Sequence, residues 1–346
     1  MLYYVPLEHI DQRYTVHMDR DIEMFLQRNK VEYTKIMPDI GASKPLKEGL
    51  FLDSAYTCKF KSAQLQMIAQ LYEDGKVTDD DSFFFSDLWF PGIEQLAYMN
   101  YFNNVNARIK GVIHAGSFTD TDFVRDMERW ALKLEEIIFD IADTIFVASD
   151  FIKADIVKKR VVNPWKIIVT GLPLDYTNLD KHINLGHPKE NTVVFNGRLC
   201  DEKQPHLFDE LAKQVQERVD FPVKFVKTQE QDLCKDAYYE LLATSKVVVS
   251  YALQENFGFG IAEASELGCY PVLPNRLVYP ELYSDCHLYD TFEQSVDMTV
   301  KALTKDWLNG ALYRSSIGNP EDIFCTWFDT DVLDSDDEYD EPWDQR

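Results

Sequence analysis

Short apolar runs alternate with longer segments of helical periodicity along most of the chain. LYYVPL, YTKIMP, SFFFSDLWF, IKGVIHAG and DTIFVAS predict strands, whereas MDRDIEMFLQRNK and DFVRDMERWALKLEEIIFDIA predict helices. Short apolar strands that alternate with helices are typical of a mostly parallel sheet covered on both faces. The first half of the chain therefore predicts an α/β domain.

The same alternation starts again after a polar stretch. KIIVTGLPLD ends the first series, and we expect YTNLDKHINLGHPKEN, residues 176–191, to be a linker. TVVFNGRL, PVKFVKT, SKVVVSYAL and CYPVLP then predict the strands of a second sheet. Two Rossmann-like, doubly wound domains that meet near residue 175 leave a cleft, and ligands bind there at the carboxyl ends of the strands.

This pattern predicts four segments along the chain. We expect an N-terminal domain over 1–175, a C-terminal domain over 190–318, a crossover segment over 319–330 that packs back on the N-terminal domain, and a mobile acidic tail over 331–346.

Composition agrees with a globular protein of two domains. The chain has 346 residues, of which 45% are hydrophobic, and no apolar run approaches the roughly 20 residues that span a bilayer. Acidic residues at Glu8 and Asp11 argue against a secretory signal. Its six cysteines form no C-x-x-C pair, which excludes the usual zinc and disulfide scaffolds and favours a reducing cytoplasm.

The net charge of −24 disfavours nonspecific binding to nucleic acid. The charge is uneven, however, because the last 18 residues, 329–346, hold nine acids and one arginine. Residues 27–61 carry seven Lys or Arg against four acids, and residues 153–166 carry five against one. These two segments are candidate basic tracks, although charge runs are more often solvated faces.

The segment ENFGFGIAEASELG, residues 255–268, follows the predicted strand SKVVVSYAL. We expect a helix that begins near Phe257 to Gly260 and ends at Gly268, with Gly258 and Gly260 allowing a ligand to approach the backbone. The free N–H groups of its first turn suit an anion such as a diphosphate. Glu263 in the early helix and Glu255 before it could accept hydrogen bonds from sugar hydroxyls, or they could be surface residues that cap the helix.

A second motif, NGRLCDEK, follows the predicted strand TVVF. Arg198 and Lys203 would lie at the carboxyl end of that strand, where two cations can neutralise a departing diphosphate. Alone the pair is equally consistent with solvated surface charges. Its place on the same predicted sheet as the two glutamates strengthens the interpretation.

Together, GRLCDEK and ENFGFGIAEA resemble the donor-binding half of a GT-B glycosyltransferase of the family 4 type, with its E-x7-E signature. GCYPVLPNRLVYPELY resembles more narrowly the queuosine-tRNA mannosyltransferase group. The resemblance implies that the chain binds a nucleotide-sugar, retains the anomeric configuration and requires no metal or cofactor. Asn256 stands where serine is commoner in the family, so sugar selectivity is not carried over. The residues that the resemblance assigns to the donor are Gly197, Arg198, Lys203, Glu255, Asn256, Phe257, Gly258 and Glu263.

The N-terminal half matches the family less closely. His114 ends a predicted strand, where family members often place a histidine near the donor sugar, although a histidine at the edge of the core is equally consistent. We expect acceptor contacts from side chains near the first and third predicted strands, with core packing as the alternative for the last two of them. These candidates are Glu8, His9, Arg13, Tyr14, Asp87 and Trp89.

Two D-x-D triplets, Asp120/Asp122 and Asp329/Asp331, are typical of metal-dependent transferases of another fold. We expect both to lie outside the donor site, and therefore we expect no metal site.

The motifs favour a retaining glycosyltransferase that uses a nucleotide-sugar, with UDP preferred over GDP. The opening LEHIDQRYT resembles the DNA-glycosylating enzymes of T-even-like phages, so the predicted acceptor is hydroxymethylcytosine in phage DNA, flipped out of the duplex in the host cytoplasm. A modified tRNA base or a polysaccharide or lipid-linked sugar are alternative acceptors. No basic amphipathic helix predicts a membrane partner. A binding module that has lost turnover is the non-enzymatic alternative.

Overall fold

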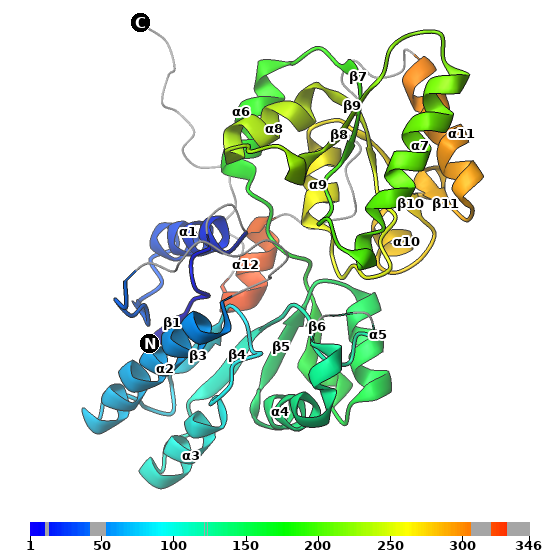
Figure 1. Ribbon diagram of the computed structural model, residues 1–346. Coiled ribbons are helices and arrows are strands. Elements are labelled where there is room, and N and C mark those ends of the chain that lie inside the picture. Colours follow the sequence, from blue (N-terminus) through cyan, green and yellow to red (C-terminus); the bar gives the residue numbers. More distant parts are fainter. Residues whose placement is uncertain (11–13, 42–52, 121, 123, 306–319, 331–346) are drawn as a thin grey trace, which may run out of the picture.

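The computed structural model describes residues 1–10, 14–41, 53–120, 122, 124–305 and 320–330. These residues form two α/β domains, one above the other in Figure 1, each built on a parallel sheet. The prediction of two Rossmann-like, doubly wound domains is confirmed.

The N-terminal sheet has the strand order β2-β1-β3-β4-β5-β6, and every pair is parallel. Its strands are β1 (Leu2–Val5), β2 (Tyr33–Lys35), β3 (Ser82–Phe85), β4 (Arg108–Ile113), β5 (Thr144–Val147) and β6 (Ile167–Val169). The helices of this part of the chain are α1 (Tyr14–Arg28), α2 (Ser54–Glu73), α3 (Glu94–Asn103), α4 (Glu128–Ile141) and α5 (Asp150–Lys159).

Both faces of this sheet are buried, which explains why its strands are apolar without strict alternation. Tyr4, Phe84 and Phe146 pack on one face together with side chains of α1. Phe83 and Phe85 belong to the core on the opposite face, with side chains of α2, α3, α4 and α5.

The C-terminal sheet has the strand order β11-β10-β9-β7-β8, again parallel throughout. Its strands are β7 (Glu190–Phe195), β8 (Lys224–Lys227), β9 (Ser245–Val249), β10 (Tyr270–Pro274) and β11 (Leu288–Tyr289). Its helices are α6 (Tyr176–Leu185), α7 (Pro205–Arg218), α8 (Lys235–Thr244), α9 (Phe259–Glu266), α10 (Tyr279–Leu282) and α11 (Phe292–Thr304). In both sheets the chain reverses direction across the sheet beside the first strand, so a switch point lies between β1 and β3 and another between β7 and β9.

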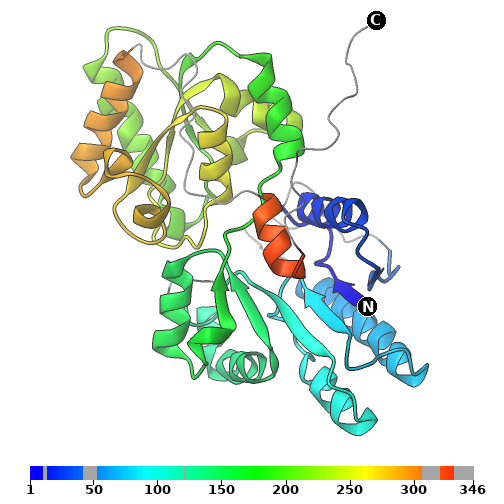
Figure 2. The same cartoon turned by 180° about the vertical axis from the view of Figure 1, so that it is seen from behind.

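The last described helix, α12 (Pro320–Phe328), returns from the C-terminal domain and packs on the N-terminal domain (Figure 2). Trp327 is fully buried, and its ring centroid lies 5.4 Å from that of Phe84 and 6.2 Å from that of Phe146. Its indole Nε1 donates a hydrogen bond to Thr170 Oγ1 at 3.0 Å. The core of the N-terminal domain thus contains a side chain from the other end of the chain.

The predicted linker over 176–191 is wrong. Residues 176–185 form α6, and β7 begins at Glu190. The segment is polar on most positions, yet Leu179 is fully buried and Ile183 packs against the same core. A narrow apolar stripe is enough to hold a helix whose other face is solvated.

Candidate functional site

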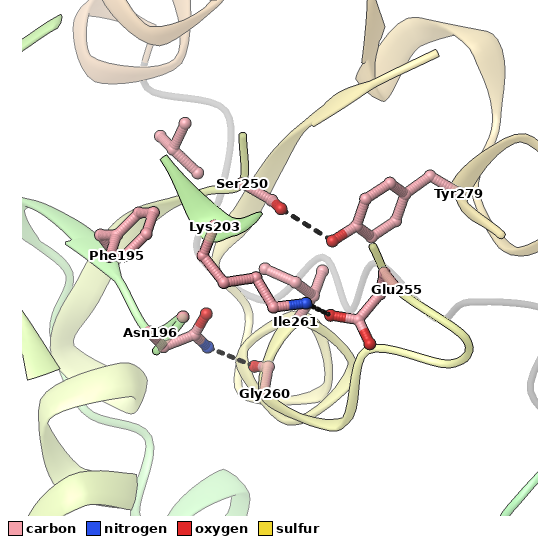
Figure 3. A pocket seen from close by; sticks show the side chains of 10 residues that line it. Phe195, Asn196, Lys203, Ser250, Glu255, Gly260, Ile261 and Tyr279 are labelled. Carbon is pink, nitrogen blue, oxygen red and sulfur yellow. Dashed lines mark hydrogen bonds and ion pairs between the residues drawn. The ribbon is translucent and has the colours of Figure 1, made fainter. Parts of the chain in front are cut away.

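A small cavity lies at the switch point of the C-terminal sheet, between the ends of β7 and β9 (Figure 3). Its volume is about 50 Å³. The lining residues are Phe195, Asn196, Gly197, Lys203, Val249, Ser250, Glu255, Gly260, Ile261 and Tyr279. The structure therefore brings together three of the predicted donor-site residues, namely Gly197, Lys203 and Glu255.

The backbone before α9 is shaped by glycine. Gly258 has φ +83°, a left-handed conformation that side chains other than glycine rarely adopt. Gly260 packs against Asn196, and a Cβ at this position would lie 2.9 Å from the amide nitrogen of that side chain. Asn196 Nδ2 donates to the carbonyl of Gly260 at 2.5 Å, which ties the end of β7 to the first turn of α9.

Lys203 provides the positive charge of the cavity. It is 7% exposed, and its amino group donates to the carbonyl of Gln254 and lies 3.2 Å from Glu255 Oε2. Arg198 does not line the cavity and is paired with Glu202. Both predicted diphosphate-binding cations are therefore held by carboxylates of the same domain, which an anionic ligand would have to displace.

Glu263 lies on α9 but does not line the cavity. Its carboxylate accepts hydrogen bonds from Tyr239 at 2.9 Å and Tyr238 at 3.1 Å, and Lys235 Nζ lies 2.7 Å away. Burial and the nearby Glu263 carboxylate raise the pKa of Tyr238, so this hydroxyl stays a donor at neutral pH. The predicted ribose-binding carboxylate is thus already surrounded by three donors.

Several hydrogen bonds join the two domains. Asn256 Nδ2 donates to the carbonyl of His114 at 2.9 Å. The carboxylate of Glu281 accepts from the backbone N–H groups of Asp150 at 2.8 Å and Phe151 at 3.0 Å. A side chain of the C-terminal domain therefore caps the N-terminus of α5 in the other domain.

His114 contacts the C-terminal domain through its carbonyl and does not line the cavity, so its role near the donor sugar stays a prediction. Its Nε2 donates to the carbonyl of Ser86 at 2.8 Å, and burial lowers the pKa of its imidazole. The ring is therefore neutral near pH 7. Phe257, also predicted at the donor site, is buried and lies edge-on against Phe259 at 4.9 Å.

The predicted acceptor residues do not form one cluster. Glu8 is 5% exposed, with one carboxylate oxygen bound by Thr57. His9 lies 2.7 Å from Asp19 Oδ2, and Tyr14 stacks on Phe259 with ring centroids 4.7 Å apart.

The other two described candidates belong to the loop after β3. Asp87 accepts from the N–H of Trp89 at 3.0 Å, and the Trp89 indole donates to Glu135 at 3.3 Å. Both thus stabilise the local fold. Arg13 lies outside the described residues.

Several cations of the candidate basic tracks are already bonded within the fold. Lys35 lies 2.7 Å from both Asp19 and Glu23, and Lys61 donates to the carbonyl of Trp89. Arg160 is 8% exposed and pairs with the fully buried Glu135 at 2.8 Å. These cations stabilise the N-terminal domain, so neither segment presents all of its charges to a phosphate backbone.

Asp122, from the first D-x-D triplet, does not line the cavity but lies near it. Its carboxylate accepts from the N–H of Val124 and lies 3.4 Å from the side-chain nitrogen of Gln254, next to Glu255. Burial and the nearby Glu202 raise the pKa of Asp122 to about 6.

The other D-x-D carboxylates are paired or undescribed. Asp120 lies 3.0 Å from Lys159, and Asp329 pairs with Lys110. Asp331 lies outside the described residues. Across the described part of the chain, no three His, Cys, Asp or Glu side chains gather as metal ligands would.

The sequence interpretation missed several residues of the site. Ser250 and Tyr279 share a hydrogen bond of 2.7 Å at the cavity wall, and Asn196 fixes the first turn of α9. Asn196 and Ser250 each directly follow the end of an observed strand, β7 and β9, and the carboxyl end of a strand is a usable signal in a parallel sheet. Lys235 and Tyr239 carry no such signal, because they reach Glu263 from another helix, α8.

Comparison with known proteins identifies the fold. No family model matches the chain. Over 103 residues it is 35% identical to tRNA-queuosine alpha-mannosyltransferase of Drosophila melanogaster, a match that covers 30% of this chain and 26% of the Drosophila enzyme.

Solved structures match over far more of the chain. Anabaena HepE in complex with UDP and glucose has a TM-score of 0.57 at 13% identity and covers 94% of this chain and 95% of its own. A sucrose-phosphate synthase from Thermosynechococcus elongatus has a TM-score of 0.58 at 12% identity. The match covers 90% of this chain and 94% of the synthase.

Among the described residues, no helix combines the length and the apolar character needed to cross a membrane. The two facing parallel-sheet domains and the structural matches agree with the GT-B arrangement. The chain therefore has the GT-B glycosyltransferase fold, and part of it resembles the queuosine-tRNA mannosyltransferase group.

Proposed function

We propose that the chain is a glycosyltransferase that moves a sugar from a UDP-sugar to a hydroxyl group on a modified nucleic-acid base. The observation that carries this proposal is the cavity at the β7–β9 switch point, where Lys203 and the first turn of α9 converge. A buried cation beside free helix N–H groups suits a diphosphate. HepE, which shares the fold, binds UDP and glucose.

Donor binding requires a change in the site. Pockets that bury a ligand of this size measure about 300–1,000 Å³, whereas the cavity holds about 50 Å³. We infer that the domains separate to admit the donor, and that its diphosphate replaces Glu255 as the partner of Lys203 and Glu202 as the partner of Arg198. The ribose hydroxyls would take a place among the donors around Glu263.

In the reaction we propose, the bond between the anomeric carbon and the diphosphate oxygen breaks first. Lys203, Arg198 and the N-terminus of α9 stabilise the negative charge that develops on the leaving group. The acceptor hydroxyl attacks from the same face, and its proton passes to the leaving phosphate oxygen. The anomeric configuration is retained, and Glu255 and the backbone around Gly258 hold the sugar during the transfer.

The acceptor is the finer part of the proposal. Hydroxymethylcytosine in DNA stays a prediction from the opening of the chain. The Drosophila relative bears the name of a tRNA-queuosine mannosyltransferase, which favours a modified tRNA base. Both acceptors present a hydroxyl on a substituent of a planar base, so the same chemistry serves either.

The test is nucleotide release from a panel of UDP- and GDP-sugars. Hydroxymethylcytosine DNA, unmodified DNA, queuosine tRNA, unmodified tRNA and no acceptor are compared side by side. We expect release from a UDP-sugar that one of the two modified nucleic acids stimulates and its unmodified counterpart does not. Release that no nucleic acid stimulates would contradict the proposed acceptor class, and no release from any donor would contradict the enzymatic function.

A further inference from the structure

Two aromatic rings from different domains close the cleft beside the cavity. Tyr14, the first residue of α1, stacks on Phe259, the first residue of α9, with centroids 4.7 Å apart and planes 12° apart. Phe259 precedes Gly260, which lines the cavity. The stack therefore joins the two domains, and it lies next to the proposed donor site.

Two buried polar groups beside these rings have an unpartnered atom. His17, one turn after Tyr14, is 5% exposed and lies edge-on to Phe259 at 6.3 Å. Asn256 is 8% exposed, and it contacts the carbonyl of His114, whose ring lies 5.3 Å from that of Tyr14. Within the described ranges, His17 Nε2 and Asn256 Oδ1 have no hydrogen-bond partner.

Such unpartnered atoms are costly to maintain. Each buried polar group without a partner costs about 1–3 kcal/mol. Here they lie near two nearly parallel aromatic rings that come from the two domains. A ligand with two flat faces and a polar edge would satisfy both features at once.

We propose that Tyr14 and Phe259 form a clamp for the acceptor base, which inserts between the two rings and bonds to His17 and Asn256 with its edge. The clamp rests on the proposed function, because it assigns the acceptor side of the same cleft. A planar heterocycle offers both faces for stacking, which contributes about 1–3 kcal/mol per base. A pyranose can pack one C–H face on an aromatic ring, but it is puckered and thicker than a base, so it fits less well between two parallel rings.

The clamp also connects the two substrates. Insertion of a base separates the rings by one ring thickness, about 3.4 Å by ordinary van der Waals contact. That movement separates α1 from α9 and so widens the cleft at the cavity. A hydroxyl on the edge of the inserted base would then lie close to Gly260 and the donor sugar.

Direct binding of nucleosides in the presence of saturating UDP tests the clamp without turnover. The probes are 5-hydroxymethyl-2′-deoxycytidine and queuosine, with methyl α-glucoside as the nonplanar control, followed by isothermal titration calorimetry. We expect at least one nucleoside to bind while UDP occupies the donor site. We expect Tyr14→Leu to weaken its binding about 5–150-fold, the loss of one stacking contact, and Tyr14→Phe to keep it within about twofold.

Matched variants separate the clamp from a general loss of structure. Tyr98→Leu removes a 64% exposed tyrosine of α3 and should leave nucleoside binding unchanged. His17→Phe keeps the ring but removes the polar edge, and it should weaken nucleoside binding several-fold while UDP still binds. If Tyr14→Leu also abolishes UDP binding, its effect on nucleosides no longer tests the clamp by itself. The nucleoside affinity of His17→Phe then serves as the test.

Three binding results would overturn the clamp. The first is that no nucleoside binds in the presence of UDP, and the second is that methyl α-glucoside binds as tightly as the nucleosides. The third is that both Tyr14→Leu and His17→Phe bind the nucleosides as tightly as the wild type does. The proposed function fails separately. Nucleosides that bind as expected without any sugar transfer would contradict the function and leave the clamp intact. Sugar transfer to a nucleic acid with a KM that Tyr14→Leu leaves unchanged would contradict the clamp and leave the function intact.

Discussion

Replacement of Lys203 by methionine removes the buried charge of the cavity while it keeps most of the side-chain volume. Lys203 is 7% exposed, and its amino group lies 3.2 Å from Glu255 Oε2. In the proposed reaction it faces the departing diphosphate. Methionine cannot stabilise that anion, and it leaves Glu255 without its cationic partner.

The size of the effect follows from the electrostatics. Two unit charges about 4 Å apart interact by about 4 kcal/mol at an effective dielectric constant of about 20. Loss of a single stabilising donor at a developing anion typically lowers kcat by about 10²–10³. We therefore expect Lys203→Met to lower kcat about 10²–10³-fold, which corresponds to about 3–4 kcal/mol.

The assay is nucleotide release at saturating donor, with urea unfolding as a check on the fold. Lys213→Met is the matched control, because the Lys213 side chain is 73% exposed and pairs only loosely with Glu210 at 3.8 Å. The control should keep full activity. A folded Lys203→Met enzyme with kcat within tenfold of the wild type would refute the assigned role of Lys203.

Three further predictions concern stability. Arg160→Met leaves the fully buried Glu135 without its cation and should lower the free energy of unfolding by about 3–5 kcal/mol in urea; a loss below about 1 kcal/mol would contradict it. Trp327→Ala removes a fully buried indole and should cost about 3–5 kcal/mol, and an unchanged urea midpoint would argue against its core position. Burial raises the pKa of Asp122 to about 6 in the folded protein, so the stability present below about pH 4 falls as the pH rises through about 6. Asp122→Asn should remove up to about 3 kcal/mol of this decline, and an unchanged pH profile would refute it.

The sequence was sufficient wherever the signal is local. Apolar runs such as TVVF and SKVVV predicted β7 and β9, and the glycines after Glu255 predicted the turn into α9, because these patterns depend on neighbouring residues alone. The confirmed fold follows from the repeated alternation of such segments. The sequence predicted that Lys203 and Glu255 lie close together, because the strands of one parallel sheet have their carboxyl ends at the same edge.

Other features depend on pairs that are distant in the chain. The contact between Lys235 and Glu263 joins two helices, and the stack of Tyr14 on Phe259 joins two domains. No local pattern in one sequence specifies such pairs. The pairing of Arg160, in one candidate basic track, is nonlocal in the same way, because its carboxylate partner Glu135 comes from another helix.

The return of α12 to the N-terminal domain has a consequence for synthesis of the chain. Trp327 completes the core around Phe84 and Phe146, yet it is made long after both. On the ribosome, the first sheet therefore emerges with part of its apolar face uncovered, while the C-terminal domain can form its own core before α12 arrives. The domain that comes first in the sequence is then the last to be completed, and its exposed face is the surface that a chaperone would have to protect in the meantime.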